Sequence, residues 1–258
     1  MDKLIYTAMS SISESGSPRQ QLNNEIANLS TPGFKSSFSA AMKTVKVSGP
    51  GFDSRYIPTS TAYDRISLAP GPRMYTGVPL DIAMNGNTVL GVTASNGELA
   101  FTRRGDLRVG SNGIVENGSG QGVRGENGPI TAPPGYSVEV TGDGSMYAVS
   151  SGKLQPAART LIGKLLLRDA SETPLERRED GLFTPAPKPG STEKQSGADI
   201  KDGKQTPSIS VGALEGSNVS TFGAMTRLLD YSRSYEANIK FIKEAKTLDE
   251  SGASMMKA

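Results

Sequence analysis

Two short patterns in the chain have the spacing of known chemical sites. Gly120-x-Gly122-x-x-Gly125 matches the fingerprint that binds a dinucleotide pyrophosphate at a helix N-terminus. The residues that follow, Glu126-Asn127-Gly128-Pro129, are turn formers and cannot begin that helix. Ser150-x-x-Lys153 has the spacing of a serine acyltransferase motif, but Gly152 lies inside it and the supporting motifs are missing. The sequence therefore predicts a β-turn or loop at the first pattern and a coincidental match at the second, rather than nucleotide or acyl chemistry.

Three residue types that often carry chemistry do not occur at all. The 258 residues include no His, no Cys and no Trp. The commonest general base, the thiol nucleophile and the preferred ligands of transition metals are therefore excluded, as are disulfides. A glycan-cleaving enzyme would still need only a pair of carboxylates in a cleft, but no motif identifies such a pair. We expect no enzymatic activity, no metal site and no cofactor.

Charge and hydropathy exclude further classes of protein. Lys and Arg number 28 against 26 Asp and Glu, a net charge of +2, which argues against a nucleic-acid partner. No apolar run approaches the roughly 20 residues that span a bilayer. The opening Met1-Asp2-Lys3-Leu4 lacks the basic and apolar regions of a cleaved signal peptide. We therefore expect no membrane span, and an unusual export route if the protein works outside the cytoplasm.

Both ends of the chain carry apolar side chains at heptad spacing. Steps of three and four residues place them on one narrow stripe of a helix, which is typical of a coiled-coil seam. Because Gly16-Ser17-Pro18 interrupts the first stretch, we expect a main helix from Pro18 to Leu29 after a helical piece from Asp2 to Ser15. A long helix is expected from Asn218 to at least Leu248. The seam residues are Ile5, Ile12, Leu22, Ile26 and Leu29, then Phe222, Met225, Leu229, Glu236 and Ile239, with Ile242 on a neighbouring stripe.

Between these ends, the sequence changes to short strand patterns separated by glycine turns. Residues 35–78 contain Gly-Pro breaks and weak periodicity, which predicts an extended linker arm. A hairpin is expected where Val89–Ala94 and Glu98–Arg103 flank Ser95-Asn96-Gly97. The predicted fold class is α+β: discontinuous N- and C-terminal coiled-coil helices form a stalk, with the arm and a central, mostly antiparallel β-domain. The predicted divisions are 1–34, 35–78, 79–208 with a mobile loop at 185–208, and 209–258.

Glu236 is a charged residue at a predicted seam position. A carboxylate there must be solvated or paired. One interpretation is a solvated helix face on which Glu236 and Lys240 form an ordinary i,i+4 pair. The other is a contact between subunits that fixes their register, as polar seam residues can. The residues alone leave both open.

Five segments, taken in chain order, carry a family resemblance. They are Ala27–Lys35 (ANLSTPGFK), Leu80–Asn87 (LDIAMNGN), Phe101–Leu107 (FTRRGDL), Gly212–Val219 (GALEGSNV) and Arg233–Asn238 (RSYEAN). Together they resemble the axial proteins of the bacterial flagellum, the rod and hook subunits, over almost the entire chain. The opening Met1–Ser10 looks most like the members that form the proximal rod. One departure is Thr88-Val89-Leu90, where members often have Gly-Phe-Phe.

The resemblance implies a structural role. Such proteins leave the cell interior through the flagellar type III export apparatus without a cleaved signal, and stack helically into a torque-transmitting tube within the periplasmic space. The implied partners are copies of the chain and other rod proteins, with the surrounding periplasmic ring as a further candidate. By the same resemblance, assembly and helix packing would use the seam residues together with Asn28, Gly33, Phe34, Leu214, Asn218, Val219 and Tyr235. Of these, Asn28 is also expected to act as a cap or turn residue, and Gly33 to serve backbone geometry.

Three alternatives remain at this stage. A distal-rod protein of the same family would share the fold and differ in its place in the rod. A coiled-coil adhesin or secreted effector would also carry unburied terminal stripes. An enzyme of rod assembly is the third, and it lacks any supporting motif.

Overall fold

The computed structural model describes residues 2–38, 42–46, 56–60, 65–150, 159–187, 197–201 and 203–255. It divides into two compact units. Unit 1 comprises residues 1–27, 39–63 and 220–258, and unit 2 comprises residues 28–38 and 64–219. Lys153, and residues 188–196 and 202 of the predicted loop 185–208, lie outside the described residues.

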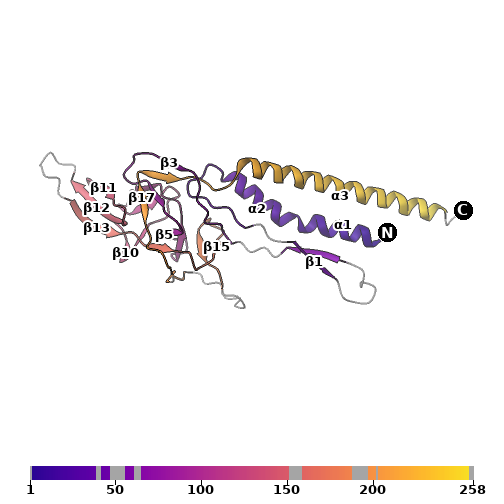
Figure 1. Ribbon diagram of the computed structural model, residues 1–258, viewed down its shortest axis with the longest axis horizontal. Coiled ribbons are helices and arrows are strands. Elements are labelled where there is room, and N and C mark those ends of the chain that lie inside the picture. Colours follow the sequence, from indigo (N-terminus) through magenta and orange to yellow (C-terminus); the bar gives the residue numbers. More distant parts are fainter. Residues whose placement is uncertain are drawn as a thin grey trace. The chain divides into compact units, whose positions relative to one another are not determined.

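Unit 1 is built from the two ends of the chain and one hairpin. Helices α1 (Asp2–Glu14) and α2 (Gly16–Ala27) lie beside the long C-terminal helix α3 (Thr221–Met255), as Figure 1 shows. Strands β1 (Met42–Lys46) and β2 (Tyr56–Ser60) pair antiparallel. The predicted break between the N-terminal helices is confirmed, and its position has a local reason. Pro18 falls in the first turn of α2, where a missing N–H removes no helical hydrogen bond.

The packed side of α3 differs from the predicted seam. Among the α3 residues whose side chains the structure describes, the buried ones are Ala224 and Ala245. On the N-terminal helices, Ala8 and Leu22 are buried. By contrast, Phe222, Met225 and Leu229 are 86%, 54% and 58% exposed. Unit 1 therefore leaves the predicted seam of α3 open to solvent over its first two turns.

Unit 2 consists of short strands joined by turns. Every pairing among its described strands is antiparallel, and the largest sheet has the order β14-β5-β6-β16-β15. The predicted hairpin is confirmed as β5–β6, with Gly97 at φ +83° in its turn. The strands are β3 (Arg73–Tyr75), β4 (Ile82–Met84), β5 (Thr88–Thr93), β6 (Leu99–Thr102), β7 (Leu107–Val109), β8 (Val115–Asn117), β9 (Arg124–Gly125), β10 (Gly128–Pro129), β11 (Tyr136–Val140), β12 (Ser145–Ser150), β13 (Arg159–Lys164), β14 (Leu167–Asp169), β15 (Leu175–Arg177), β16 (Phe183–Pro185), β17 (Ile209–Val211) and β18 (Ala213–Glu215).

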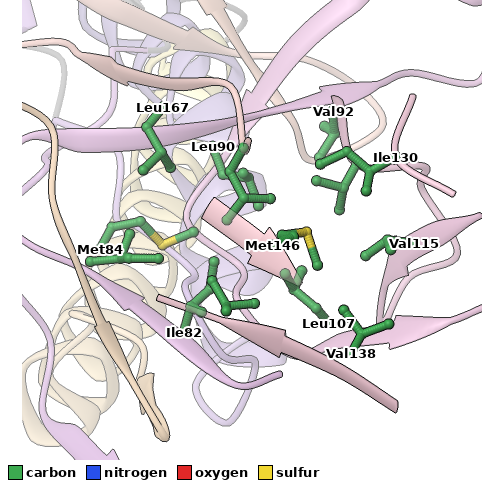
Figure 2. Close-up of a cluster of buried hydrophobic side chains, with 14 of the residues drawn as sticks. Ile82, Met84, Leu90, Val92, Leu107, Val115, Ile130, Val138, Met146 and Leu167 are labelled. Atoms are coloured by element: carbon green, nitrogen blue, oxygen red, sulfur yellow. The ribbon is translucent and has the colours of Figure 1, made fainter. Parts of the chain in front are cut away.

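The main core of unit 2 fills the space between these strands. Figure 2 shows Met84, Leu90 and Met146 directed into one cluster, and each is at most 1% exposed. A second cluster around Phe101 and Phe183 packs on the other side of the same strand region. Neighbouring residues of β5 contribute to different clusters: Leu90 to the first and Val89 to the second. This alternation explains why β5 reads as a nearly continuous apolar run.

The observed architecture confirms the coarse fold class. The chain is α+β, with a mostly antiparallel β-domain and a C-terminal helix. Strands β1, β2 and β3 lie in the region predicted as an extended arm, and the proposed division points stay predictions. Across the parts of the chain that the structure describes, no helix is apolar enough over sufficient length to cross a membrane.

Candidate functional site: the junction of the terminal segments

Segments from distant parts of the sequence meet at one buried cluster in unit 2. We call residues 28–38 the N-segment and residues 213–219 the C-segment. The cluster, termed the junction, joins Lys35 of the N-segment to Glu215 of the C-segment and to Arg103, which follows β6. These three side chains are 0%, 2% and 1% exposed. Three buried charges at one point indicate a built site, because an unpaired charge there would be costly.

Glu215 is the centre of the junction. Its Oε1 accepts hydrogen bonds from Lys35 Nζ at 2.7 Å and from the backbone N–H of Gly71 at 3.0 Å. Its Oε2 accepts from Arg103 Nε at 2.8 Å, and Arg103 Nη2 lies 2.7 Å away. Both carboxylate oxygens are thus occupied by donors from different segments of the chain.

The two cations are also bonded to backbone carbonyl groups. Lys35 Nζ donates to Ala69 O at 2.8 Å. Arg103 donates to the carbonyl oxygens of Met84, Gly86 and Thr88 at 2.9, 2.6 and 3.2 Å. The planar guanidinium thereby holds the β4–β5 turn against the C-segment, which a lysine could not do with the same geometry.

The junction carries two positive charges for one negative charge, and the pKa values reflect this. The pKa of Lys35 is lowered from 10.5 to about 8, first by burial and then by the Arg103 charge, against the opposing effect of Glu215. Burial by itself would raise the pKa of the Glu215 carboxyl. The charges and hydrogen bonds of Arg103 and Lys35 outweigh that effect and hold it below its usual value. Glu215 is therefore ionised at neutral pH.

The backbone of the N-segment approaches the junction very closely. Gly33 has φ +70°, and its N–H donates to the carbonyl oxygen of Glu215 at 2.7 Å. A Cβ at Gly33 would overlap the carbonyl group of Arg103, and a Cβ at Gly71 would overlap that of Gly216. Only glycine fits at these two positions. The expectation that Gly33 serves backbone geometry agrees with this arrangement.

Asn218 binds the N-segment from the other side. Its Oδ1 accepts from the Ser36 N–H at 2.6 Å, and its Nδ2 donates to the carbonyl oxygens of Ser67 and Ala69 at 3.0 and 3.1 Å. Its own N–H donates to Phe34 O at 3.3 Å. The guanidinium carbon of Arg177 lies 4.3 Å from the centre of the Phe34 ring, a cation–π contact. The N-segment and C-segment are thus bonded through main chain and side chains alike.

The sequence-predicted residues fall into three groups. Gly33, Phe34 and Asn218 meet at the junction, and Leu214 stands opposite Met74 in the β18–β3 pair. Asn28 Oδ1 accepts from the Thr31 hydroxyl at 3.1 Å, the predicted turn role. Those in or beside the terminal helices are Leu22, buried; Ile5, Ile12, Ile26, Leu29, Val219, Ile239 and Ile242, partly buried; and Phe222, Met225, Leu229, Tyr235 and Glu236, exposed. Their role in assembly stays a prediction.

An ion pair with a buried carboxylate joins α2 to α3 in unit 1, and the contact between subunits predicted at Glu236 stays a prediction. Glu25 on α2 is 1% exposed, and its Oε2 lies 3.2 Å from Arg227 Nη2 on α3. Lys240, the expected partner of Glu236, instead lies 3.9 Å from Glu244. Sequence reasoning missed Glu25 because it follows polar neighbours on a helix of low apolar content. Lys35, Arg103 and Glu215 were quoted within motifs but not singled out, since charge alone does not reveal burial.

The three charged side chains of the junction bond to one another and to the backbone. No cluster of acidic, histidine or cysteine side chains among the described residues could hold a metal ion. The residues of the Gly120-x-Gly122-x-x-Gly125 pattern belong to the turns and short strands around β9, as expected. At the junction, every charged group is buried and bonded within the chain. What this arrangement can do is hold the N-segment and C-segment in fixed positions.

Comparisons with known proteins point to one family. Residues 210–255 match the model described as the flagellar basal body rod FlgEFG protein C-terminal region. The flagellar basal-body rod protein FlgF of Salmonella typhimurium is 34% identical over 244 residues, spanning 94% of this chain and 93% of the relative. FlgF of Escherichia coli is 31% identical over 243 residues with the same shares. FlgG of Buchnera aphidicola subsp. Acyrthosiphon pisum is 28% identical over 260 residues, spanning 90% of this chain and 93% of the relative.

Proposed function

The chain belongs to the flagellar basal-body rod protein family, and on that premise we propose that it assembles with copies of itself and with other rod proteins as a structural subunit of the proximal rod. The observation that carries the proposal is 34% identity to a FlgF protein over 94% of the chain. A FlgG relative has 28% identity over 90% of the chain. The proximal assignment therefore stands ahead of the distal one.

The exposed side chains of α3 support assembly through the terminal helices. Phe222, Met225 and Leu229 stand at spacings of three and four residues, so they form one apolar stripe, here called the α3 stripe. Monomeric soluble proteins rarely leave such a stripe uncovered. In an assembled rod, terminal helices of neighbouring subunits would cover it and form a coiled-coil stalk. The residues named from the sequence as assembly contacts are part of this proposal.

Further features of the role follow from the same premise. Helical stacking would give a tube that transmits torque and leaves a channel for export. The chain would reach the periplasmic space through the flagellar export apparatus without a cleaved signal, and the surrounding ring would be a further neighbour. Its relatives are named as rod proteins, and we infer a purely structural role without enzymatic activity.

The test is deletion of the gene followed by complementation. Electron microscopy of purified basal bodies should show arrest before the rod is complete, with no hook or filament. The wild-type gene should restore the rod. The pair Phe222→Ser and Met225→Ser should not, although the protein is made and exported. The matched control is Phe222→Leu with Met225→Leu, which keeps the stripe apolar and should restore it.

Each outcome bears on a different part of the proposal. Normal flagella in the deletion strain would refute a rod role. A deletion strain that retains a proximal rod would assign the chain to the distal rod instead. Full restoration by the serine pair would leave the rod role intact but refute assembly through the α3 stripe.

A further inference from the structure

The N-segment and the C-segment bond to each other, and both bond to one intervening stretch, residues 65–75. Gly33 and Ser36 donate backbone hydrogen bonds to Glu215 and Asn218 across the junction. The stretch between them supplies Ala69 O, which accepts from both Lys35 Nζ and Asn218 Nδ2. A single acceptor shared by both segments ties the position of each to that of the other.

The bonds among these three segments join residues that are far apart in the sequence. Lys35 and Glu215 are separated by 180 residues, and Ser36 and Asn218 by 182. If the C-segment moves away, the buried Lys35 ammonium loses its carboxylate and the Gly33 N–H loses its acceptor. If the N-segment moves away, Asn218 loses both its Ser36 donor and its Phe34 acceptor. Either segment without the other would leave buried polar groups unpaired. Leaving such a group unpaired costs more free energy than its hydrogen bond contributes.

We infer that the junction couples the ordering of the two segments, so that local release of the C-segment releases the N-segment and the reverse. This coupling goes beyond the rod role and is a property of the single chain. Helix α2 ends at Ala27 and is followed directly by the N-segment, and the C-segment is followed by α3, which begins at Thr221. The segments that connect the two terminal helices to unit 2 would therefore become ordered together or not at all.

Amide hydrogen exchange of the full-length protein tests the coupling from both sides. Asn218→Ala should accelerate exchange at Gly33 and Ser36 by roughly tenfold or more. Gly33→Ala, made on the other segment, should accelerate exchange at Leu214 and Asn218 to a similar degree. If Gly33→Ala fails to fold, Phe34→Ala replaces it, because it removes the ring contact with Arg177 from the N-segment without straining the backbone. Reciprocity is required, since a coupling free energy acts equally in both directions.

The matched control is Val115→Ala, a core substitution in unit 2 away from the junction. Val115 is fully buried, so its truncation destabilises the unit in general. Val115→Ala should accelerate exchange at Gly33, Ser36 and Asn218 by the same factor as at the other amides of unit 2. The double variant Asn218→Ala with Phe34→Ala should exceed the stronger single variant by less than about threefold, because a coupled unit opens only once. Acceleration confined to the substituted segment, or the same pattern from Val115→Ala, would overturn the inference.

Discussion

Glu215→Gln and Lys35→Met, two substitutions at the same ion cluster, should differ sharply in their effect on the stability of unit 2. Glu215 is the only carboxylate bonded to the Lys35 and Arg103 cations in the described junction. Its amide replacement keeps the shape but leaves two buried positive charges without a negative partner. Breaking a buried pair in this way costs about 3–5 kcal/mol. We therefore expect Glu215→Gln to lower the unfolding free energy by that amount.

Lys35→Met should be nearly neutral for the opposite reason. A pKa lowered from 10.5 to about 8 means that charging Lys35 costs about 3 kcal/mol more in the folded protein than in water. The substitution removes this cost and leaves Arg103 paired with Glu215. Against it stands the lost hydrogen bond to Ala69, worth about 1.5 kcal/mol where a charged group takes part, whereas the bond to Glu215 is already included in the lowered pKa. The opposing contributions leave a net change within about 2 kcal/mol of zero.

Urea unfolding at pH 7 measures the difference. Because the chain has no Trp, circular dichroism replaces indole fluorescence as the signal. Exchange of the β5 and β6 amides reports on unit 2 alone, which separates its unfolding from that of the helices. Equal losses from the two substitutions would refute the charge argument. So would a loss below about 1 kcal/mol for Glu215→Gln.

Three further predictions follow from the structure. The unfolding free energy of unit 2 should rise between pH 8 and pH 10.5, because the lowered pKa of Lys35 makes the folded state lose its proton first; Lys35→Met should flatten this rise in a series of urea titrations. Gly71→Ala should lower the midpoint of thermal unfolding by several degrees, since a Cβ there overlaps the Gly216 carbonyl, whereas Gly142→Ala meets only an ordinary contact at 3.7 Å and should have a much smaller effect. Arg227→Met should destabilise the helices of unit 1 by about 1–3 kcal/mol, because it removes a charged donor from buried Glu25. In the same helix-melting measurement, Glu236→Gln should change the stability by less than about 0.5 kcal/mol. An equal effect of Arg227→Met and Glu236→Gln would mean that Glu25 does not depend on its α3 partner.

The local sequence pattern was sufficient to predict helices, strands and turns, but not which side of a helix is buried. The β5–β6 hairpin was predictable because the turn at Gly97 and the apolar run before it are adjacent in sequence. The helix break at Pro18 was predictable for the same reason. The packed side of α3 was not, because Ala224 and Ala245 contribute little to an apolar pattern in which Phe222 and Leu229 dominate. A hydropathy pattern is dominated by large apolar side chains, whereas the buried residues of this helix are small.

The junction was hidden from sequence reasoning by distance along the chain. Lys35, Arg103 and Glu215 each appear in a motif with an ordinary surface composition. Their burial follows from pairings such as Glu215 with Arg73 in the β18–β3 ribbon, which no local pattern encodes. Glycine gave a partial signal, since Gly33 was expected to serve backbone geometry. The reason for that geometry, a carbonyl group of Arg103 against its Cα, required the fold.

The hydrogen bonds of the junction indicate why it is built from polar rather than apolar side chains. A buried ion cluster is not a strong source of stability, and apolar side chains of the same volume often do as well. Apolar side chains, however, do not distinguish one neighbouring backbone carbonyl group from the next. Arg103 bonds to three particular carbonyl groups of the β4–β5 turn, and Asn218 to two of residues 65–75. A register error of one residue would break all of these bonds at once. This exact positioning of neighbouring segments within unit 2 is what the polar cluster contributes.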